Sequence, residues 1–416
     1  MKHYHTSKSD WHWPALSAAI LACLSFTCIQ NKETTKDHDV PLTVVAMGDA
    51  GEGNRIQRAN ASLLSDMQTG KHDGGEFSVM LFLGDNFYNI GLNIPKDDVP
   101  GKIKEVLGPF RSTLEGIGRR NVHAIPGNHD YYAANAVDVS LLFGLISFEA
   151  GPIGLSDKGN KREAEIDLWS YHWNMPASVL YPVSSLSKDS VQFIFFDSGF
   201  PLRTPSSAWH SALDSLKKIL VDSRQQQGVV WRILAVHHPL YTVGEHGGYS
   251  VWNDETRRVD YLTACDRDSN AVGWVKNWLD PEDICTQKYR EYVDSLQSVI
   301  ASAGARIHLV LSGHDHSLQL LYRPEVESPV LPKVQVVSGA GSKTTRVKVP
   351  LPPRDYTASH PDSKNEGESS PGFVQLRFER NLVHIIFFDS SIREVLDMGG
   401  GKREFRVARD GSLVAE

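Results

Sequence analysis

The chain has 416 residues, of which 41% are hydrophobic and 22% are charged. This length and composition are typical of a globular protein with a substantial core. The formal charge of −7 is mildly negative and no stretch of the sequence forms a basic stripe, so we expect no nucleic-acid partner.

The N-terminus carries a targeting pattern. Lys2 and Lys8 precede an apolar run at 14–29, and a polar stretch follows it. A basic flank, a short apolar core and a polar exit predict a secretory signal over residues 1–29 and a polar tether at 30–40. A transmembrane anchor is the alternative, but the run is shorter than the ~20 residues needed to span a bilayer. We therefore expect an exported protein.

The cysteines leave two questions open. Cys28 is followed by the polar tether, which is the arrangement of a lipid-attachment cysteine, although Thr27 is an unusual residue before one. The protein is thus either secreted, periplasmic or lipid-anchored to a membrane. Cys265 and Cys285 lie twenty positions apart, and in an exported protein they are either bridged, which we favour, or two free thiols.

Residues 41–398 read as one domain, with 399–416 as a C-terminal tail. Short, continuous apolar runs alternate with amphipathic stretches, which predicts buried strands joined by helices in βαβ units. The expected strands are 42–47, 79–83, 122–125, 192–196, 229–236 and 306–311, and the expected helices are 55–67, 206–221 and 288–303.

Beyond residue 334 the pattern changes to strands without helices between them. The expected strands are 334–337, 373–378 and 382–388, the last two forming a hairpin around Arg380 and Asn381. The whole order predicts an α/β (α+β) fold of two mixed sheets flanked by helices. Two segments read as insertions, 133–174 and 242–285, and 350–372 reads as a polar loop. Tryptophans of the second insertion would either cover the substrate as a lid or simply pack: Trp252, Trp274 and Trp278.

Five clusters of polar residues each follow an expected strand directly. They are Gly-Asp-Ala-Gly with Asp49, Gly-Asp-Asn-Phe-Tyr with Asp85, Gly-Asn-His-Asp with Asn128, His-His-Pro with His237 and Gly-His-Asp-His with His314. Because binding sites gather at the carboxyl ends of the strands in an open α/β sheet, we expect the five clusters to meet at one edge.

The chemistry of these clusters is that of a metal site. Two carboxylates, one amide oxygen, three imidazoles and one phenol are enough ligands for two cations. Two metals about 3.5–4 Å apart can hold a phosphoryl group and activate a water, and a carboxylate such as Asp85 can bridge them. Each cluster alone is more often an ordinary turn. Their joint occurrence favours a dinuclear metal site.

The five blocks resemble those of the calcineurin-like metallophosphoesterase superfamily, and within it the small, tartrate-resistant-like purple acid phosphatases. The resemblance runs from about Leu42 to about Asp389 and includes Gly-Glu-His-Gly around His246. It implies a four-layer sandwich. It also implies that Asp49, Tyr88 and His316 hold Fe(III), that Asn128, His237 and His314 hold a divalent metal (Fe, Zn or Mn), and that Asp85 bridges the two.

Two positions place the chain within the superfamily. Many of its phosphodiesterases have a histidine two positions after the first aspartate, where this chain has Gly51, whereas purple acid phosphatases have a tyrosine at the position of Tyr88. A phenol has a pKa near 10 and ionises beside a strong Lewis acid, so a tyrosine ligand favours Fe(III). We expect His238 to support the site without being a ligand, and Asp315 to be a spacer.

The resemblance implies an acid phosphatase that hydrolyses small phosphate monoesters through a hydroxide held by the metals. His129 and His246 match family positions near the substrate, where either would steady the phosphoryl group or protonate the leaving oxygen, and Asp130 would orient His129. A phosphodiesterase or nucleotidase on the same metal pair is the alternative, and a non-catalytic secreted binding protein is a second one. The oligomeric state stays open.

Overall fold

The computed structural model describes residues 39–91, 99–131, 175–204, 209–247, 251–253, 258–260, 282, 284, 286–347, 351, 354–358, 367–398, 401 and 403–414. The expected signal segment, the insertion at 133–174, and Cys28, Cys265 and Cys285 lie outside these residues. The lid expected from Trp252, Trp274 and Trp278 also rests on side chains outside this description.

The first sheet is mixed and, within the described residues, has eight strands. Their order is β17-β16-β14-β13-β1-β2-β3, and β15 pairs with β14. Strands β1, β2 and β3 run parallel, while β13, β14, β16 and β17 pair antiparallel. Their bounds are β1 Thr43–Met47, β2 Val79–Leu83, β3 Val122–Ile125, β13 Gly372–Phe378, β14 Leu382–Asp389, β15 Glu394–Val395, β16 Glu404–Ala408 and β17 Leu413–Val414.

The second sheet is also mixed, and the described residues give it seven strands in the order β12-β10-β11-β9-β6-β5-β4. Strands β5, β6, β9 and β11 run parallel, and β4, β10 and β12 pair antiparallel. Their bounds are β4 Ala177–Pro182, β5 Ser190–Phe195, β6 Val229–Ala235, β9 Leu309–Ser312, β10 Leu318–Tyr322, β11 Val334–Ser338 and β12 Tyr356–Thr357. A separate hairpin joins β7 (Val251–Asn253) to β8 (Arg258–Asp260).

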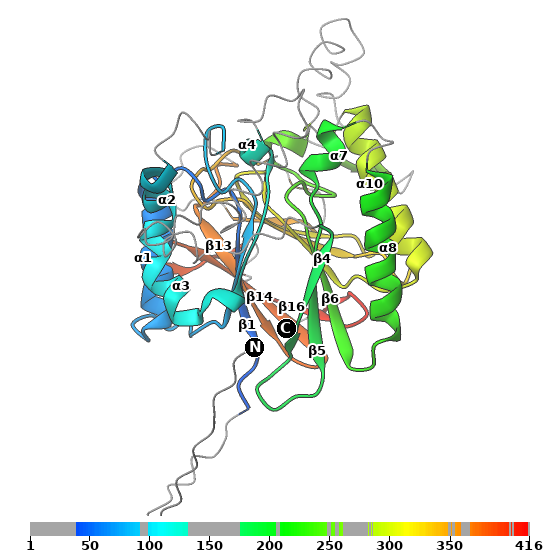
Figure 1. Ribbon diagram of the computed structural model, residues 1–416, viewed down its shortest axis with the longest axis horizontal. Helices are drawn as coiled ribbons and strands as arrows, with labels where there is room; N and C mark the ends of the chain where they lie inside the picture. The colour runs from blue at the N-terminus through cyan, green and yellow to red at the C-terminus, as the bar shows by residue number, and fades with distance from the viewer. Residues whose placement is uncertain are drawn as a thin grey trace, which may run out of the picture. The chain divides into compact units, whose positions relative to one another are not determined.

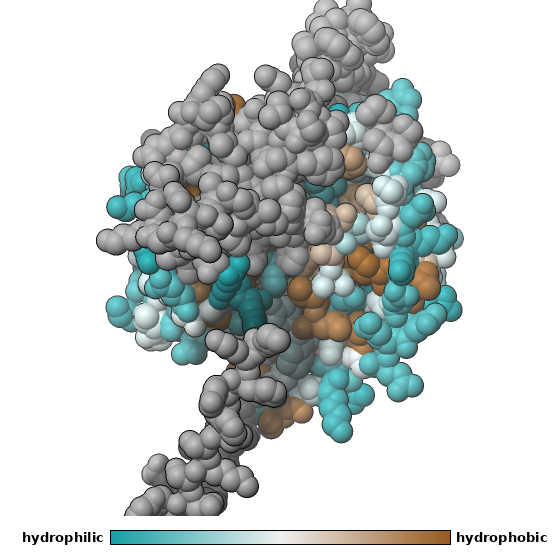
Figure 2. All heavy atoms as spheres, in the orientation of Figure 1, coloured by the Kyte–Doolittle hydropathy of each residue, from teal (hydrophilic) through white to brown (hydrophobic). Residues whose placement is uncertain are grey.

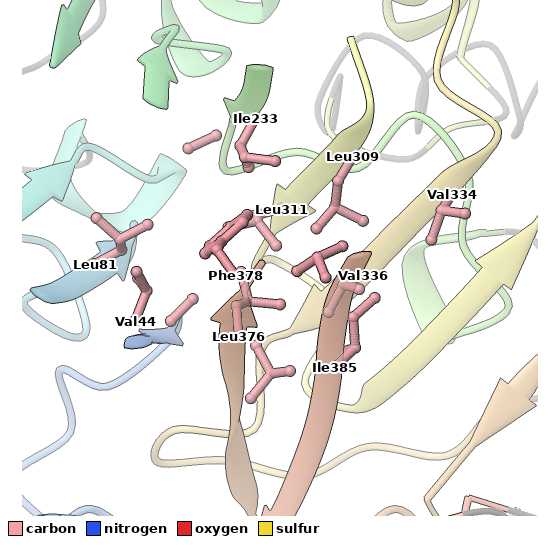
Figure 3. Close-up of a cluster of buried hydrophobic side chains, with 14 of the residues drawn as sticks. Val44, Leu81, Ile233, Leu309, Leu311, Val334, Val336, Leu376, Phe378 and Ile385 are labelled. Carbon is pink, nitrogen blue, oxygen red and sulfur yellow. The ribbon is translucent and has the colours of Figure 1, made fainter. Parts of the chain in front are cut away.

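The main hydrophobic core lies between the two sheets. Figure 3 shows apolar side chains of the first sheet, such as Val44 and Leu376, facing those of the second, such as Leu309 and Val336. Strand β2 shows why continuous apolar runs are needed: Leu81 enters this core, while Met80 and Phe82 point to the opposite face. Both faces of the strand are therefore buried, as the sequence pattern predicts.

Helices cover the outer face of each sheet, which gives four layers (Figure 1). The first sheet packs against α1 (Arg55–Gln68), α2 (Val99–Leu107) and α3 (Arg111–Ile117), and the second against α8 (His210–Gln225) and α10 (Gln287–Ala303). In Figure 2 the rim where α8 lies is largely hydrophilic, as an amphipathic helix requires. Shorter helices are η1 Gly108–Phe110, η2 Arg119–Asn121, α4 Asn128–Tyr131, α7 Gly199–Arg203 and η4 Glu245–Gly247.

The predicted fold class is confirmed, with one boundary corrected. The expected tail at 399–416 is part of the fold, because β16 pairs with β14 and buries Phe405 and Val407 in the main core. Glu404–Ala408 does alternate between polar and apolar residues, as a half-buried strand does, but five residues near the end of the chain are a short stretch on which to predict a strand. Among the described residues no helix has the length and apolar character to cross a membrane.

Candidate metal centre

The five polar clusters follow the carboxyl ends of five parallel strands. Asp49 follows β1, Asp85 and Tyr88 follow β2, and Asn128 follows β3, all in the first sheet. His237 follows β6, and His314 and His316 follow β9, in the second sheet. Their hydrogen bonds link the two groups, so the structure brings all seven side chains together as the sequence predicts.

Three of these residues have a strained backbone. Asp49, Asp85 and His314 have φ angles of 57°, 53° and 69°, in the left-handed region that residues with a side chain seldom adopt. Such a conformation costs on the order of 1–3 kcal/mol and persists only where its surroundings impose it. The sharp turns at the strand ends therefore fix where these side chains point.

The glycines of the motifs allow the loops to approach closely. A Cβ atom on Gly84 would lie closer than 3.0 Å to the His237 ring, and one on Gly127 would lie equally close to the Asp85 carboxylate. The close approach of these loops therefore requires residues without a side chain.

Four donors form the first half of the site. The Tyr88 hydroxyl lies 3.0 Å from Oδ1 of Asp49, 2.8 Å from Oδ2 of Asp85 and 3.2 Å from Nε2 of His316. Burial, with the charges of Asp49 and Asp85 added to it, raises the pKa of Tyr88 well above its usual 10. Without a cation the Tyr88 phenol therefore keeps its proton. The phenol ionises only when a strongly positive metal ion replaces that proton.

Three further donors form the second half. Oδ1 of Asn128 lies 2.8 Å from Nε2 of His237 and 3.2 Å from Nδ1 of His314. Nδ1 of His237 faces the carbonyl oxygen of Leu83 at 2.8 Å. A carbonyl oxygen only accepts, so Nδ1 of His237 carries a proton and neutral His237 directs its Nε2 lone pair at the amide oxygen.

Two lone pairs that face each other repel unless a positive charge lies between them. Although burial opposes it, the carboxylates of Asp85 and Asp49 raise the pKa of His237, so that a proton can supply this charge. Donor separations of 2.8–3.5 Å occur on both sides of the site. They match the distances of roughly 3.0–3.4 Å between neighbouring ligands of an ion with bonds of about 2.1 Å. The donor set therefore fits cations.

Asp85 lies between the two halves. Its Oδ1 is 3.5 Å from Nε2 of His237, and its Oδ2 is 2.8 Å from the Tyr88 hydroxyl. Although burial opposes ionisation, His237 and His129 lower the pKa of Asp85, so its carboxylate is charged. One oxygen on each side is the arrangement expected of a bridging ligand. Ligand atoms lie within 4.8 Å of one another in two groups, Asp49 with Asp85 and His237, and His237 with His238 and His314.

His129 and His246 lie beside opposite halves of the site. The His129 ring is 4.3 Å from the Tyr88 ring, and its Nε2 is 3.9 Å from Asp85. The His246 ring is 4.2 Å from the His314 ring and 6.4 Å from the His316 ring. A phosphoryl group held over the seven donors would thus have an imidazole near each side.

Asp130 holds a loop, and the role expected for it needs correction. Its oxygens accept hydrogen bonds from the backbone of Asn86, Phe87 and Gly127 and from the Asn86 amide, at 2.7–3.1 Å. We expected Asp130 to orient His129, but Nδ1 of that ring instead lies 2.6 Å from the carbonyl oxygen of Asn89. The bonds made by Asp130 fix the loop that carries Asp85 and Tyr88.

Asp315 and His238, the two other polar residues of their motifs, are both fully buried. Asp315 is fully buried, accepts a hydrogen bond from the His246 backbone at 2.9 Å, and binds Thr242, so it holds the His246 loop and is more than a spacer. Nδ1 of His238 is 2.8 Å from the Ser198 hydroxyl, and burial lowers the pKa of His238 well below its usual range. A neutral, packed imidazole is consistent with the supporting role expected for it.

Four residues of the site were not identified from the sequence: Glu282, Arg203, Asp197 and Lys343. Glu282 is buried and 2.9 Å from Nδ2 of Asn128, and Lys343 places its ammonium 3.6 Å from the centre of the Tyr88 ring. Asp197 lies two positions after the end of β5, as Asp49 does after β1 and Asp85 after β2, so the same strand-end signal marks it. Glu282 follows no strand end of the two sheets, so no sequence signal marks it.

Gly51 is closed to any side chain. A Cβ atom there would lie closer than 3.0 Å to the backbone of Asn86 and Phe87, and the Gly51 carbonyl accepts a hydrogen bond from the Tyr88 backbone at 3.1 Å. The loop that brings Tyr88 into the site therefore occupies the space that a histidine at position 51 would need.

The fold and the site define a metal-dependent phosphoesterase. Residues 9–318 match the family of calcineurin-like phosphoesterases, and the chain belongs to this family of hydrolases. No curated protein matches it significantly.

Solved structures are similar to the chain at low sequence identity. GAP50, the anchor in the inner membrane complex of Plasmodium, is 14% identical with a TM-score of 0.51, and the match covers 89% of this chain and 88% of that one. PhoD is 10% identical with a TM-score of 0.47, and the match covers 91% of this chain and 72% of that one.

Proposed function

We propose that the protein is a purple acid phosphatase, which hydrolyses phosphate monoesters at a site of Fe(III) and a divalent Fe, Zn or Mn ion. The observation that carries the proposal is the place of the Tyr88 hydroxyl, within 3.2 Å of Asp49, Asp85 and His316. A phenolate ligand favours a trivalent ion over a divalent one. The closed position at Gly51 supports the same choice, because the chain has no room for the histidine of many phosphodiesterases.

The seven donors divide between the two ions. Asp49, Tyr88 and His316 would hold the iron, Asn128, His237 and His314 would hold the divalent ion, and Asp85 would bridge them. When bound, the two metals supply Lewis acidity toward the phosphate oxygens and a nucleophilic hydroxide. Side chains around the site would protonate the leaving oxygen and hold the phosphoryl group.

His129 and His246 complete the reaction. The leaving alcohol oxygen takes up a proton as its bond to phosphorus breaks, and an imidazolium beside it can supply that proton. His246 suits this role because it lies over the divalent half, while His129, held by Asn89, suits a hydrogen bond to a phosphoryl oxygen. The products are an alcohol and inorganic phosphate.

The visible spectrum and the metal content test the proposal together. The purified protein should contain two metals per chain, at least one of them iron, and show a broad visible band from phenolate-to-Fe(III) charge transfer. Tyr88→Phe should abolish the band because it removes the donor oxygen, whereas Tyr322→Phe, at a tyrosine on β10, should leave it unchanged. A colourless protein with two zinc ions would contradict the iron assignment.

Substrate preference needs its own assay. The protein should hydrolyse p-nitrophenyl phosphate faster than bis-p-nitrophenyl phosphate, with its optimum at acid pH. The reverse preference would favour the alternative, a phosphodiesterase or nucleotidase. Full biological activity after removal of both metals would favour a non-catalytic binding protein, and GAP50, a similar structure named as an anchor, gives that alternative a precedent.

Export is a separate proposal based on the expected signal at 1–29 and the polar tether at 30–40. Cell fractionation should find the mature protein outside the cytoplasm and shorter by about 29 residues, as expected for a cleaved signal. Retention in the membrane fraction that is lost in Cys28→Ser would assign a lipid anchor, and release in both forms would assign soluble export.

A further inference from the structure

Glu282 contacts two of the three donors of the second half of the site. It is 4% exposed. Its Oε2 accepts a hydrogen bond from Nδ2 of Asn128 at 2.9 Å, and its backbone carbonyl oxygen faces Nε2 of His314 at 3.1 Å. Its other carboxylate oxygen forms an ion pair with Arg203. No motif of the family resemblance includes this residue.

The first contact decides which way the Asn128 amide faces. An amide group can turn by 180° and exchange its oxygen and nitrogen, unless its partners select one orientation. A carboxylate only accepts hydrogen bonds, so the NH₂ group must face Glu282. Oδ1 then faces His237 and His314, at 2.8 Å and 3.2 Å. With the opposite orientation the site would present N–H groups to a cation.

The second contact decides which nitrogen of His314 carries the proton. The carbonyl oxygen of Glu282 accepts a hydrogen bond, so Nε2 of His314 is protonated and Nδ1 keeps its lone pair. Nδ1 is the atom that faces Oδ1 of Asn128. A single residue thus sets the donor atoms of two ligands on one side of the site.

The ion pair with Arg203 fixes Glu282 in turn. Arg203 is the last residue of α7, and the first backbone N–H groups of this helix bind Oδ1 of Asp197 at 3.0 Å and 3.1 Å. Asp197 follows β5 and also binds Tyr131 of α4, the helix that begins with Asn128. In Figure 1, α4 and α7 lie at the same end of the sheets. Asp197 therefore links α7, which carries Arg203, to α4, which carries Asn128.

We propose that Glu282 is the positioning residue of the divalent-metal half, and that Arg203 holds it there. The proposal rests on the proposed function in one respect, that a divalent cation binds between Asn128, His237 and His314. A partner that orients metal ligands commonly contributes 10- to 100-fold to the affinity for the metal. Glu282 should therefore act on the second metal and leave the first in place.

The test measures metal binding to the full-length protein. After a chelator has removed the weaker ion, the protein is dialysed against graded Zn²⁺ and analysed for metal. Glu282→Ala should raise the dissociation constant for Zn²⁺ about 10- to 100-fold. The variant should keep one tightly bound metal and the visible band of the first half. A general disturbance of the fold would remove both of these as well.

A matched control removes the carboxylate partner of a different arginine. Asp355 pairs with Arg323, where Oδ2 and Nη2 are 3.0 Å apart, and within the described part of the chain it forms no hydrogen bond or ion pair with the seven donors. Asp355→Ala should therefore bind Zn²⁺ as the wild type does, although it too removes a buried carboxylate that pairs with an arginine.

A paired substitution gives a positive test. Asn128→Asp alone should bind Zn²⁺ poorly, because two carboxylates then face each other at the 2.9 Å contact. Adding Glu282→Gln should restore binding. The amide at position 282 can donate a hydrogen bond to one oxygen of the carboxylate at position 128, and the second oxygen of that carboxylate then faces the metal. This rescue would support the proposal even if Glu282→Ala failed to fold, and its absence would overturn it.

The outcomes separate this inference from the proposed function. A wild-type protein that binds no divalent cation contradicts both. A wild type that binds Zn²⁺, with an unchanged dissociation constant in Glu282→Ala, contradicts this inference alone. Loss of both metals in Glu282→Ala, with both kept in Asp355→Ala, would also overturn it, because Glu282 would then support the whole site.

Discussion

At the scale of single residues, Lys343 places a positive charge against the aromatic face of a proposed metal ligand. Its ammonium is 3.6 Å from the centre of the Tyr88 ring and 2.5 Å from Oε1 of Glu52, which holds it there. A cation over an aromatic face is attracted to its electrons and stabilises them. The visible charge-transfer band expected from Tyr88 should therefore shift when Lys343 is replaced.

Lys343→Met should move the charge-transfer band to longer wavelength. Without the ammonium the electrons of the phenolate lie higher in energy, and less energy is needed to transfer one to the proposed Fe(III). Visible absorption of the purified protein measures the shift, and Lys217→Met on the exposed side of α8 serves as control. An unchanged band would mean that Lys343 does not act on the phenolate.

His246→Ala should affect poor leaving groups most. If His246 protonates the leaving oxygen, its loss should lower kcat on alkyl phosphates by about 10²–10⁴-fold and on p-nitrophenyl phosphate much less, because p-nitrophenolate leaves without a proton. His210→Ala, at an exposed histidine of α8, provides the comparison. Equal losses on both substrates would remove the acid role from His246.

At the scale of elements, β16 lies between β14 and β17 in the first sheet. Phe405 and Val407 are 3% and 0% exposed and pack in the main core. Truncation after Met398 should lower the free energy of unfolding by about 3–6 kcal/mol, since burying each large apolar side chain contributes about 1.5–3 kcal/mol. Urea unfolding measures the loss, and deletion of residues 415–416 alone is the control. Unchanged stability would contradict a structural role for β16.

The strands and helices with strong periodicity could be predicted from the sequence. Strand β2 is apolar at every position because both of its faces are buried, and α10 shows a buried stripe at helical spacing. The convergence of the seven candidate ligands could be predicted for a related reason. Each follows such a strand, and the carboxyl ends of parallel strands converge.

Other parts of the structure carry no such signal. Strand β4 carries an exposed leucine, Leu180, and ends in a proline, so polar and apolar residues do not separate cleanly between its faces, and β16 is only five residues long; both therefore give a weak strand signal. Glu282 reaches the site from the segment between β8 and α10, and its importance comes from Asn128 and Arg203, which are 154 and 79 positions away in the chain. Long-range pairing of this kind is fixed by the fold and leaves no local pattern.

At the scale of the whole molecule, buried neutral histidines couple stability to pH. Burial, and then the charge of Arg232, lowers the pKa of His308 to about 3, and burial lowers that of His123 to about 4. In the unfolded chain both should titrate near 6.5. Below that pH the unfolded state takes up protons that the folded state cannot, so stability should be full above about 6.5 and fall as the pH drops.

His308→Gln should weaken this dependence. Glutamine can still accept the hydrogen bond from the Arg232 backbone, which now spans 3.0 Å, but it does not ionise. At pH 7.5 the variant should have a lower free energy of unfolding than the wild type. At pH 5 this difference should be smaller by about 2 kcal/mol, because only the wild type loses stability through protonation of His308 in the unfolded chain. Urea unfolding at the two pH values measures the change, and a constant deficit would show that His308 is not the group responsible.

The order in which the chain is made has a consequence for the completion of the site. Strand β1 pairs with β13 near the other end of the sequence, Thr43 opposite Arg377, and Asp49 accepts a hydrogen bond from the backbone of His314, 265 positions later. During synthesis from the N-terminus, the first half of the chain therefore has β2 on one side of β1 but lacks β13 on the other side, and it also lacks the candidate ligands His237, His314 and His316. Stable capture of both ions must wait until ribosomes have made most of the polypeptide.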